Sequence, residues 1–366
     1  MMTSVLTRGF MKRQAFSRCI STTTAGGKPN YAFAFDIDGV LIKGKRLIPE
    51  ATRALKMLNG DNSANRNIPF VLLTNGGGVT EEEKARQISE IVGVKIDAKQ
   101  VILSHSPMQK LASKYRDKRV LIVGGKGRQC YDVAKKYGFG EAVTPHDIMH
   151  WNSSSWPLAK PSSDLSVLTS AAQEFSTLPI HAVMVFHDTY DWGRDLQIML
   201  DALCSKDGIL GSRKGDYSTQ DVPLYWSNVS TLFLYTCSCF NSNLFIERSS
   251  PRLGQGAFKI ALDSLYKKLT DHELHSTSFG KPHGATYRYA EDVLGRLGAR
   301  DQGRVYAVGD NPAADIQGAN NYGWTSVLVR TGVFAGDNSK EFPAAMVCDH
   351  VEEAVEKIIF DEEKRK

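Results

Sequence analysis

Short apolar runs recur along the chain, and most of them end in small or polar residues. Their length and their content of β-branched and aromatic side chains predict buried strands. The runs are Tyr31–Phe35, Phe70–Leu73, Val120–Val123, His181–Phe186, Val305–Val308 and Ser326–Val329.

The segments between several of these runs carry helical signals. A helix is expected over Glu50–Leu58, directly after a proline, and another over Ala285–Leu297. A third is expected over Thr80–Val92, where Thr80 and Glu83 have the spacing of a capping box. Alternating strands and helices predict an α/β fold, in which a largely parallel sheet carries helices on both faces. Such sheets place their chemistry at the carboxyl ends of the strands.

The first predicted strand runs directly into Asp36-Ile-Asp38-Gly39. Residues two apart in a strand share one face, so the two carboxylates begin on the same side of the sheet. Carboxylates this close repel each other unless a cation or a proton separates them, and oxygen ligands suit Mg²⁺. The alternative interpretation is an Asx-rich turn that closes the strand.

Three later segments place further reactive groups at strand ends or in tight loops. The second strand is followed by Thr74-Asn75-Gly-Gly-Gly, whose hydroxyl and main-chain amides can hold phosphate oxygens. Lys281 lies in a loop before a predicted helix, and the strand over residues 305–308 leads into Asp310 and Asp315. The order along the chain is therefore Asp-x-Asp, Thr-Asn-Gly, Lys and Gly-Asp-x4-Asp.

This ordered set resembles the haloacid dehalogenase superfamily of Mg²⁺-dependent phosphotransferases, over most of residues 31–335. The resemblance implies a doubly wound, mostly parallel Rossmann-like core with an inserted α/β cap domain of the IIA type. It assigns residues 30–103 and 251–360 to the catalytic core, and 104–250 to the cap that selects the substrate. The segments Asp191–Gln197 and Gly254–Phe258 resemble a mitochondrial branch related to the cat eye syndrome critical region protein.

The resemblance also implies roles for the first aspartates. Asp36 is expected to be the nucleophile that forms an aspartyl-phosphate, and Asp38 the general acid and base. Mg²⁺ is expected to bind Asp36, the main chain of Asp38, and Asp310. Because Asp38 supplies an acid that dehalogenases do not need, hydrolysis of a phosphate ester is favoured.

The remaining motif residues are expected to bind the phosphoryl group or to offset its negative charge. Thr74 and the amide of Asn75 would bind a transferring oxygen, and Lys281 would offset negative charge on the nucleophile and the phosphoryl group. Asp315 is expected to support the waters of the metal or to orient Lys281. Position 314 is Ala, where relatives often carry Ser or Thr, so one hydrogen bond of that loop is expected to be missing.

Three polar residues follow the predicted strand at 181–186 in the cap region. His187, Asp188 and Asp191 are candidates for contacts with the substrate. Alternatively, they cap the helix that follows.

The charge of the chain is unevenly distributed. Residues 1–35 contain no Asp or Glu and carry five of the 45 Lys and Arg residues. The rest of the chain therefore has 40 basic and 40 acidic residues, and its formal charge is zero. The net charge of +5 therefore gives no reason to expect a nucleic-acid partner. A basic, acid-free segment rich in Ser and Thr is typical of a mitochondrial transit peptide, which we expect at residues 1–28, with the matrix as destination. The alternative is a disordered basic tail.

Residues 229–250 are unusual for the implied family. They read as apolar where relatives have a short polar connection, so they are either an insertion or a stretch that the mature protein lacks, such as a splicing error in the gene model. Polar residues interrupt this stretch, and no integral membrane span is expected.

The sequence thus predicts a mitochondrial, Mg²⁺-dependent phosphatase of a small phosphate ester, with a link to glycerophospholipid synthesis. The alternative is a protein of the same fold that is catalytically weak or inactive and serves as a binding protein or scaffold. The oligomeric state is left open.

Overall fold

The computed structural model describes residues 29–158, 174–230, 232–233, 252–301 and 303–365. The predicted transit peptide and most of the unusual stretch at 229–250 lie outside the described residues. Among the helices in the described part of the chain, none combines the length and apolar character that a membrane crossing requires.

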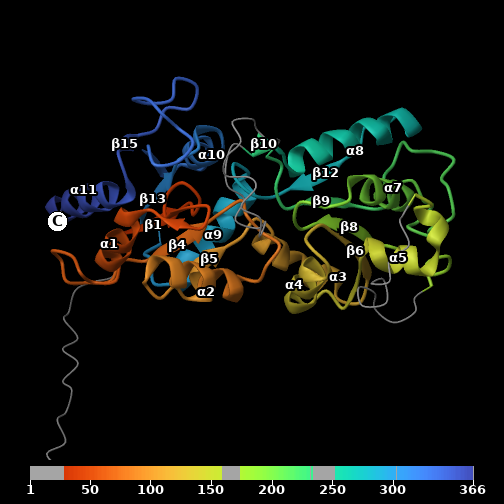
Figure 1. Ribbon diagram of the computed structural model, residues 1–366, viewed down its shortest axis with the longest axis horizontal. Coiled ribbons are helices and arrows are strands. Elements are labelled where there is room, and N and C mark those ends of the chain that lie inside the picture. The colour runs from red at the N-terminus through yellow and green to blue at the C-terminus, as the bar shows by residue number, and fades with distance from the viewer. Residues whose placement is uncertain (1–28, 159–173, 231, 234–251, 302, 366) are drawn as a thin grey trace, which may run out of the picture.

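The first of two large sheets has six parallel strands in the order β15-β14-β13-β1-β4-β5 (Figure 1). Its strands are β1 (Tyr31–Phe35), β4 (Phe70–Leu73), β5 (Val101–Ile102), β13 (Arg304–Gly309), β14 (Thr325–Val329) and β15 (Met346–Cys348).

Helices cover both faces of this sheet, because successive strand residues alternate between two apolar clusters. Phe33 and Phe35 pack with α1, α2 and α11, whereas Ala32 and Ala34 pack with α9 and α10. These helices are α1 (Pro49–Leu58), α2 (Glu81–Val92), α9 (Gly284–Arg296), α10 (Gln317–Tyr322) and α11 (Val351–Lys364).

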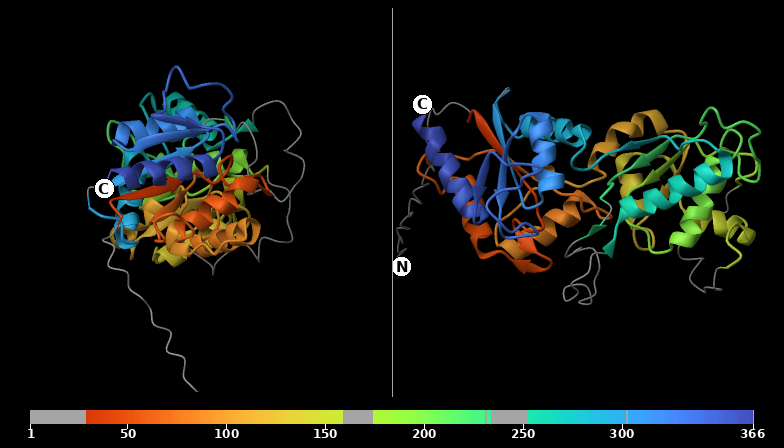
Figure 2. Two further views of the ribbon diagram at one scale, coloured as in Figure 1. Left: turned by 90° about the vertical axis from the view of Figure 1, so that its left-hand side faces the viewer. Right: turned by 90° about the horizontal axis from the view of Figure 1, so that it is seen from above.

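The second sheet has five parallel strands in the order β12-β9-β8-β6-β7 and forms a separate lobe beside the first (Figure 2). Its strands are β6 (Arg119–Val123), β7 (Glu141–Val143), β8 (Ala182–Val185), β9 (Leu224–Trp226) and β12 (Ser276–Ser278). Helices of this lobe are α3 (Ala112–Tyr115), α4 (Gln129–Tyr137), α5 (Pro145–Trp151), α7 (Trp192–Leu203) and α8 (Gln255–Thr270).

Two short antiparallel pairs complete the described strands. The pair β2 (Ile42–Lys43) and β3 (Arg46–Leu47) follows the Asp36–Gly39 loop. The pair β10 (Leu232–Phe233) and β11 (Arg252–Leu253) precedes α8.

The α/β class and the six predicted strands are confirmed, and the predicted helices lie within one or two residues of α1, α2 and α9. The capping box at α2 is only half formed. The Thr80 hydroxyl accepts a hydrogen bond from the main-chain amide of Glu83. The Glu83 carboxylate pairs with Arg86 instead of reaching back to Thr80, because a charged partner lies one turn along the helix.

The expected domain boundary after residue 250 differs from the observed packing. That boundary places residues 251–278 in the first domain, yet β12 pairs with β9 of the second sheet. The buried side chains of Phe258, Leu262 and Tyr266 on α8 pack in the apolar cluster of the second lobe, together with Trp226. The chain therefore returns to the first lobe only after β12, since the apolar face of α8 needs the second sheet to bury it.

Candidate active site

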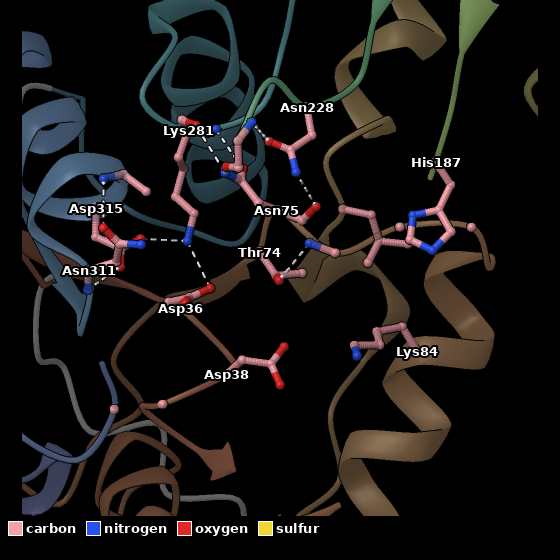
Figure 3. A pocket seen from close by; sticks show the side chains of 18 of the residues that line it. Asp36, Asp38, Thr74, Asn75, Lys84, His187, Asn228, Lys281, Asn311 and Asp315 are labelled. Carbon is pink, nitrogen blue, oxygen red and sulfur yellow. Dashed lines mark hydrogen bonds and ion pairs between the residues drawn. The ribbon is translucent and has the colours of Figure 1, made fainter. Parts of the chain in front are cut away.

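Three neighbouring strands of the first sheet, β4, β1 and β13, end at one edge of the sheet. Because the strands are parallel, the polar residues after them meet there, and a loop before α9 adds a lysine (Figure 3). They line a cavity of about 210 Å³, together with side chains of the second lobe. The predicted core-domain site residues on this cavity are Asp36, Asp38, Thr74, Asn75, Lys281, Asp310 and Asp315.

Lys281 contacts two carboxylates of the site. Its Nζ lies 2.8 Å from Oδ1 of Asp36 and 2.6 Å from Oδ1 of Asp315, and the residue is only 4% exposed. The side chain of Asn75 holds its main chain, accepting a bond from the Lys281 amide at 2.7 Å and donating to its carbonyl at 2.9 Å. The ammonium group is therefore fixed between two carboxylates.

Burial and mutual repulsion set the charges of the site. Burial opposes the charge on Lys281, but Asp315 and Asp36 outweigh it and raise the pKa of the lysine. Burial raises the pKa of Asp36 well above its ordinary value, and Lys281 offsets part of that shift. Burial, reinforced by the charge of Asp315, raises the pKa of Asp310 to about 7. A further cation beside these carboxylates would relieve the repulsion.

The carboxylates form one acidic cluster. Asp36, Asp310 and Asp315 each offer an oxygen, and these oxygens lie within 4.8 Å of one another. The expected metal ligands Asp36 and Asp310 are thus brought together. Asp315, expected to support the waters of the metal or to orient Lys281, joins them. Three carboxylate oxygens are a donor set that suits a hard divalent cation such as Mg²⁺.

Main-chain segments at Gly39 and Gly332 lie close to the carboxylate of Asp310. Oδ2 of Asp310 accepts a hydrogen bond of 2.7 Å from the main-chain amide of Val333. A Cβ added to Gly332 would lie 1.8 Å from this oxygen, and one added to Gly39 would lie 2.3 Å from it. Gly39 also has a φ of +84°, a left-handed conformation that glycine adopts readily and that lets the chain turn after Asp38. The two glycines leave room for the carboxylate.

Asp38 faces the cavity next to Asp36 but outside the acidic cluster (Figure 3). Its Oδ1 is buried and makes no hydrogen bond within the described residues. Burial raises the pKa of Asp38, while the charges of Lys84 and Lys281 partly offset the shift. A raised pKa favours the protonated form of the carboxyl group, which is the form that a general acid requires.

The loop after β4 supplies the expected hydroxyl. Thr74 is buried, and its Oγ1 accepts a hydrogen bond of 3.0 Å from the amide of Gly76, which orients the hydroxyl group. The side chain of Asn75 is engaged with Lys281, as described above, and the main-chain carbonyl of Asn75 accepts a weak bond of 3.5 Å from the side-chain amide of Asn228. The expected contact of the Asn75 amide with phosphate stays a prediction.

The three candidate substrate contacts from the second lobe, His187, Asp188 and Asp191, differ in where their side chains lie. His187 lines the cavity, directly after β8. Asp191 instead caps α7, where its Oδ1 accepts a bond of 3.1 Å from the amide of Arg194, so the helix-capping alternative holds for this residue. Asp188 is not among the residues that line the cavity; burial raises its pKa to about 6.

Sequence reasoning missed several cavity residues. They are Lys84 of α2, Asn228 and Ser230 after β9, and Tyr190 and Gln129 of the second lobe. Most of them come from the second lobe, so only the packing of the two lobes brings them to the cavity. Lys84 follows three glutamates at a predicted helix start. In the sequence it therefore looks like one more charged residue on the surface of that helix.

The chain is similar to known hydrolases in sequence. A family profile described as haloacid dehalogenase-like hydrolase matches residues 33–140, and one described as HAD-hydrolase-like matches residues 278–354. A mitochondrial hydrolase of Saccharomyces cerevisiae is 36% identical over 355 residues, which cover 90% of this chain and 95% of that protein. A cardiolipin synthase (CMP-forming)/mitochondrial hydrolase fusion protein of Schizosaccharomyces pombe is 40% identical over 330 residues, 88% of this chain; the chain spans about half (52%) of that protein.

Solved structures share the fold. A p-nitrophenyl phosphatase from Archaeoglobus fulgidus superposes with a TM-score of 0.59 at 15% identity, covering 91% of this chain and all (100%) of the other. A glycerol phosphate phosphatase from Mycobacterium tuberculosis, in complex with magnesium, gives a TM-score of 0.56 at 17% identity over 89% and 76% of the two chains. With its four motifs gathered around one cavity and these relatives along nearly its whole length, the chain belongs to the haloacid dehalogenase-like hydrolases.

Proposed function

We propose that this protein is a Mg²⁺-dependent phosphatase that hydrolyses a small phosphate monoester through an aspartyl-phosphate on Asp36. The observation that carries the proposal is the position of the Asp36 carboxylate. It faces the cavity, 2.8 Å from the buried ammonium of Lys281 and beside the carboxylates of Asp310 and Asp315. A nucleophilic carboxylate beside fixed positive charge is what attack on an anionic phosphoryl group needs.

Mg²⁺ fits the donor set, and Asp36, Asp310 and Asp315 are the side chains that would hold it, with the main chain of Asp38 as a further candidate ligand. When bound, the ion would offset the negative charge of the phosphate and of the carboxylates around it. Burial, together with repulsion within this cluster, raises the pKa values of Asp36 and Asp310.

The chain's own residues divide the reaction into two displacements. An oxygen of Asp36 attacks phosphorus, the bond to the ester oxygen breaks, and Asp38 gives that oxygen its proton. Asp38, now a carboxylate, then takes a proton from the water that attacks the aspartyl-phosphate, so that inorganic phosphate leaves and Asp36 is regenerated. Thr74 and Lys281 donate hydrogen bonds to the phosphoryl oxygens, and Asp315 and Asn75 keep Lys281 in place.

Mitochondria are the proposed location. Two curated relatives carry the word mitochondrial in their names, and the acid-free composition of residues 1–28 supports import into the matrix. One of these relatives is fused to a cardiolipin synthase, which supports a phosphorylated precursor of glycerophospholipids as the substrate.

The test is turnover of p-nitrophenyl phosphate by the purified protein with and without Mg²⁺, compared with Asp36→Asn. The amide keeps the shape of the side chain and removes its nucleophilic oxygen, so we expect the variant to lose at least about 1000-fold in kcat, in the range seen for removed nucleophiles. Equal turnover by both proteins would remove Asp36 as the nucleophile. Absence of turnover in the unsubstituted protein would favour the binding-protein alternative.

A further inference from the structure

A second buried lysine lines the cavity on the side away from Lys281. Lys84 is the fourth residue of α2, is 6% exposed, and extends toward the cavity beside Asp38 (Figure 3). A cation near the start of a helix faces the positive end of the helix dipole, and burial removes its water. Both effects disfavour a lysine here, so helix stability does not explain its presence.

His187 lies on the same side of the cavity and comes from the other lobe (Figure 3). Its side chain is 8% exposed, and a Cβ added to Gly78 would lie 2.5 Å from its Cδ2, so the ring packs directly on the loop after β4. Burial, together with His105 and Lys84, lowers the pKa of His187 to about 4. Near neutral pH the ring is therefore uncharged and carries one N–H, and its Nδ1 lies 3.7 Å from Oδ2 of Asp188.

The proposed reaction occupies the opposite end of the cavity, where Asp36, Thr74 and Lys281 face the phosphoryl group. The end near Lys84 and His187 is left for the remainder of the substrate. An ammonium group and a neutral imidazole N–H are both donors, and together they complement the oxygens of an anion. The cavity of about 210 Å³ is smaller than the ~300–1,000 Å³ typical of ligand pockets, which favours a small substrate.

We propose that Lys84 and His187 form a second subsite that binds an anionic group of the substrate, which is therefore a phosphate monoester that carries a second negative group, either a carboxylate or another phosphate. This inference rests on the proposed phosphatase function. The competing interpretation is that Lys84 only offsets the charge of Asp38, in which case the choice between charged and uncharged substrates would not depend on it.

Three esters on one three-carbon chain separate these interpretations. They are 3-hydroxypropyl phosphate, which has an uncharged end, 3-phosphooxypropanoate, which has a carboxylate, and propane-1,3-diol bisphosphate. The readout is the ratio of kcat/KM for each charged ester to kcat/KM for the uncharged one, in the unsubstituted protein, Lys84→Met and Lys84→Arg. Lys43→Met is the matched control, because Lys43 also lines the cavity but is exposed.

We expect the unsubstituted protein to prefer one charged ester, and the preferred ester identifies the class of the anion. Lys84→Met should lower that preference about tenfold to a hundredfold, mainly through KM, because the lost contact is made in the bound substrate as well as in the transition state. Lys84→Arg should retain most of the preference, and Lys43→Met should change it less than about threefold.

Several results would overturn the subsite. They are a preference for the uncharged ester, an equal ratio in Lys84→Met and the unsubstituted protein, and an equal loss in Lys84→Met and Lys43→Met, which would indicate only a general electrostatic field. Hydrolysis of p-nitrophenyl phosphate without hydrolysis of either charged ester would overturn it as well. Failure of the proposed function looks different, because no phosphate ester would then be hydrolysed in the presence of Mg²⁺.

Discussion

Replacement of Lys281 by methionine tests the electrostatic design of the site. The substitution keeps a long side chain and removes the ammonium group that lies 2.8 Å from Asp36 and 2.6 Å from Asp315. At an effective dielectric constant of about 20, each attraction is about 6 kcal/mol before the desolvation of the charges is subtracted. Removing one partner of a buried ion pair typically lowers stability by about 3–5 kcal/mol, because an uncompensated charge remains.

We therefore expect Lys281→Met, in metal-free buffer at pH 7, to lower the free energy of unfolding by about 3–5 kcal/mol. The loss should shrink toward pH 4, since protonation of Asp36, whose pKa is raised by burial, neutralises a charge that has lost its partner. With Mg²⁺ present, kcat should fall about 100- to 1000-fold, as for the loss of one donor to a developing oxyanion.

The assay is urea unfolding followed by circular dichroism, paired with steady-state kinetics. Lys110→Met is the matched control, because Lys110 pairs with Asp292 at 2.6 Å where both side chains are more than half exposed (56% and 53%). An exposed pair of this kind contributes at most about 1 kcal/mol. The reasoning would be refuted if the two variants lost equal stability, or if Lys281→Met kept its turnover.

Two further predictions concern Asp310. Gly332→Ala should weaken Mg²⁺ affinity at least about tenfold, because the added Cβ would lie 1.8 Å from Oδ2 of Asp310, whereas Gly295→Ala, where nothing lies within 4 Å, should leave it unchanged; calorimetric titration of both variants checks this. Burial and Asp315 raise the pKa of Asp310 from 3.8 to about 7. A carboxyl group with a higher pKa in the folded chain stabilises the fold at low pH and loses that contribution as the pH rises, so metal-free protein should lose stability between pH 4 and pH 7. Urea unfolding across this range should show a smaller loss in Asp310→Asn and in saturating Mg²⁺, and an identical pH dependence in all three samples would contradict the assignment.

Most of the first lobe follows from local patterns. The strand over residues 31–35 is continuously apolar because helices bury both of its faces, and the polar residues after β1, β4 and β13 mark the sheet edge where the site lies. The order of the motifs along the chain indicates the site residues. Parallel pairing brings together those that follow β1, β4 and β13, and the loop before α9 adds Lys281.

The second lobe was harder to predict because its site residues depend on packing between segments that are far apart in sequence. The boundary expected after residue 250 failed because the apolar face of α8 does not reveal which sheet covers it. Lys84 lies at the start of α2, where the sequence pattern indicates only helix capping. Its burial at the cavity is evident only from the fold. Asp191 illustrates the opposite case, since a residue placed among possible substrate contacts caps α7.

The central claim is that Asp36 carries the phosphoryl group, and trapping that intermediate tests it most directly. The protein is mixed with Mg²⁺ and a phosphate ester, quenched in acid and reduced with borohydride, which converts an aspartyl-phosphate to homoserine but leaves a free carboxylate unchanged. Peptide mass spectrometry should then find homoserine at position 36 in the unsubstituted protein and none in Asp36→Asn. Homoserine at another aspartate, or hydrolysis without any trapped residue in the unsubstituted protein, would contradict the account.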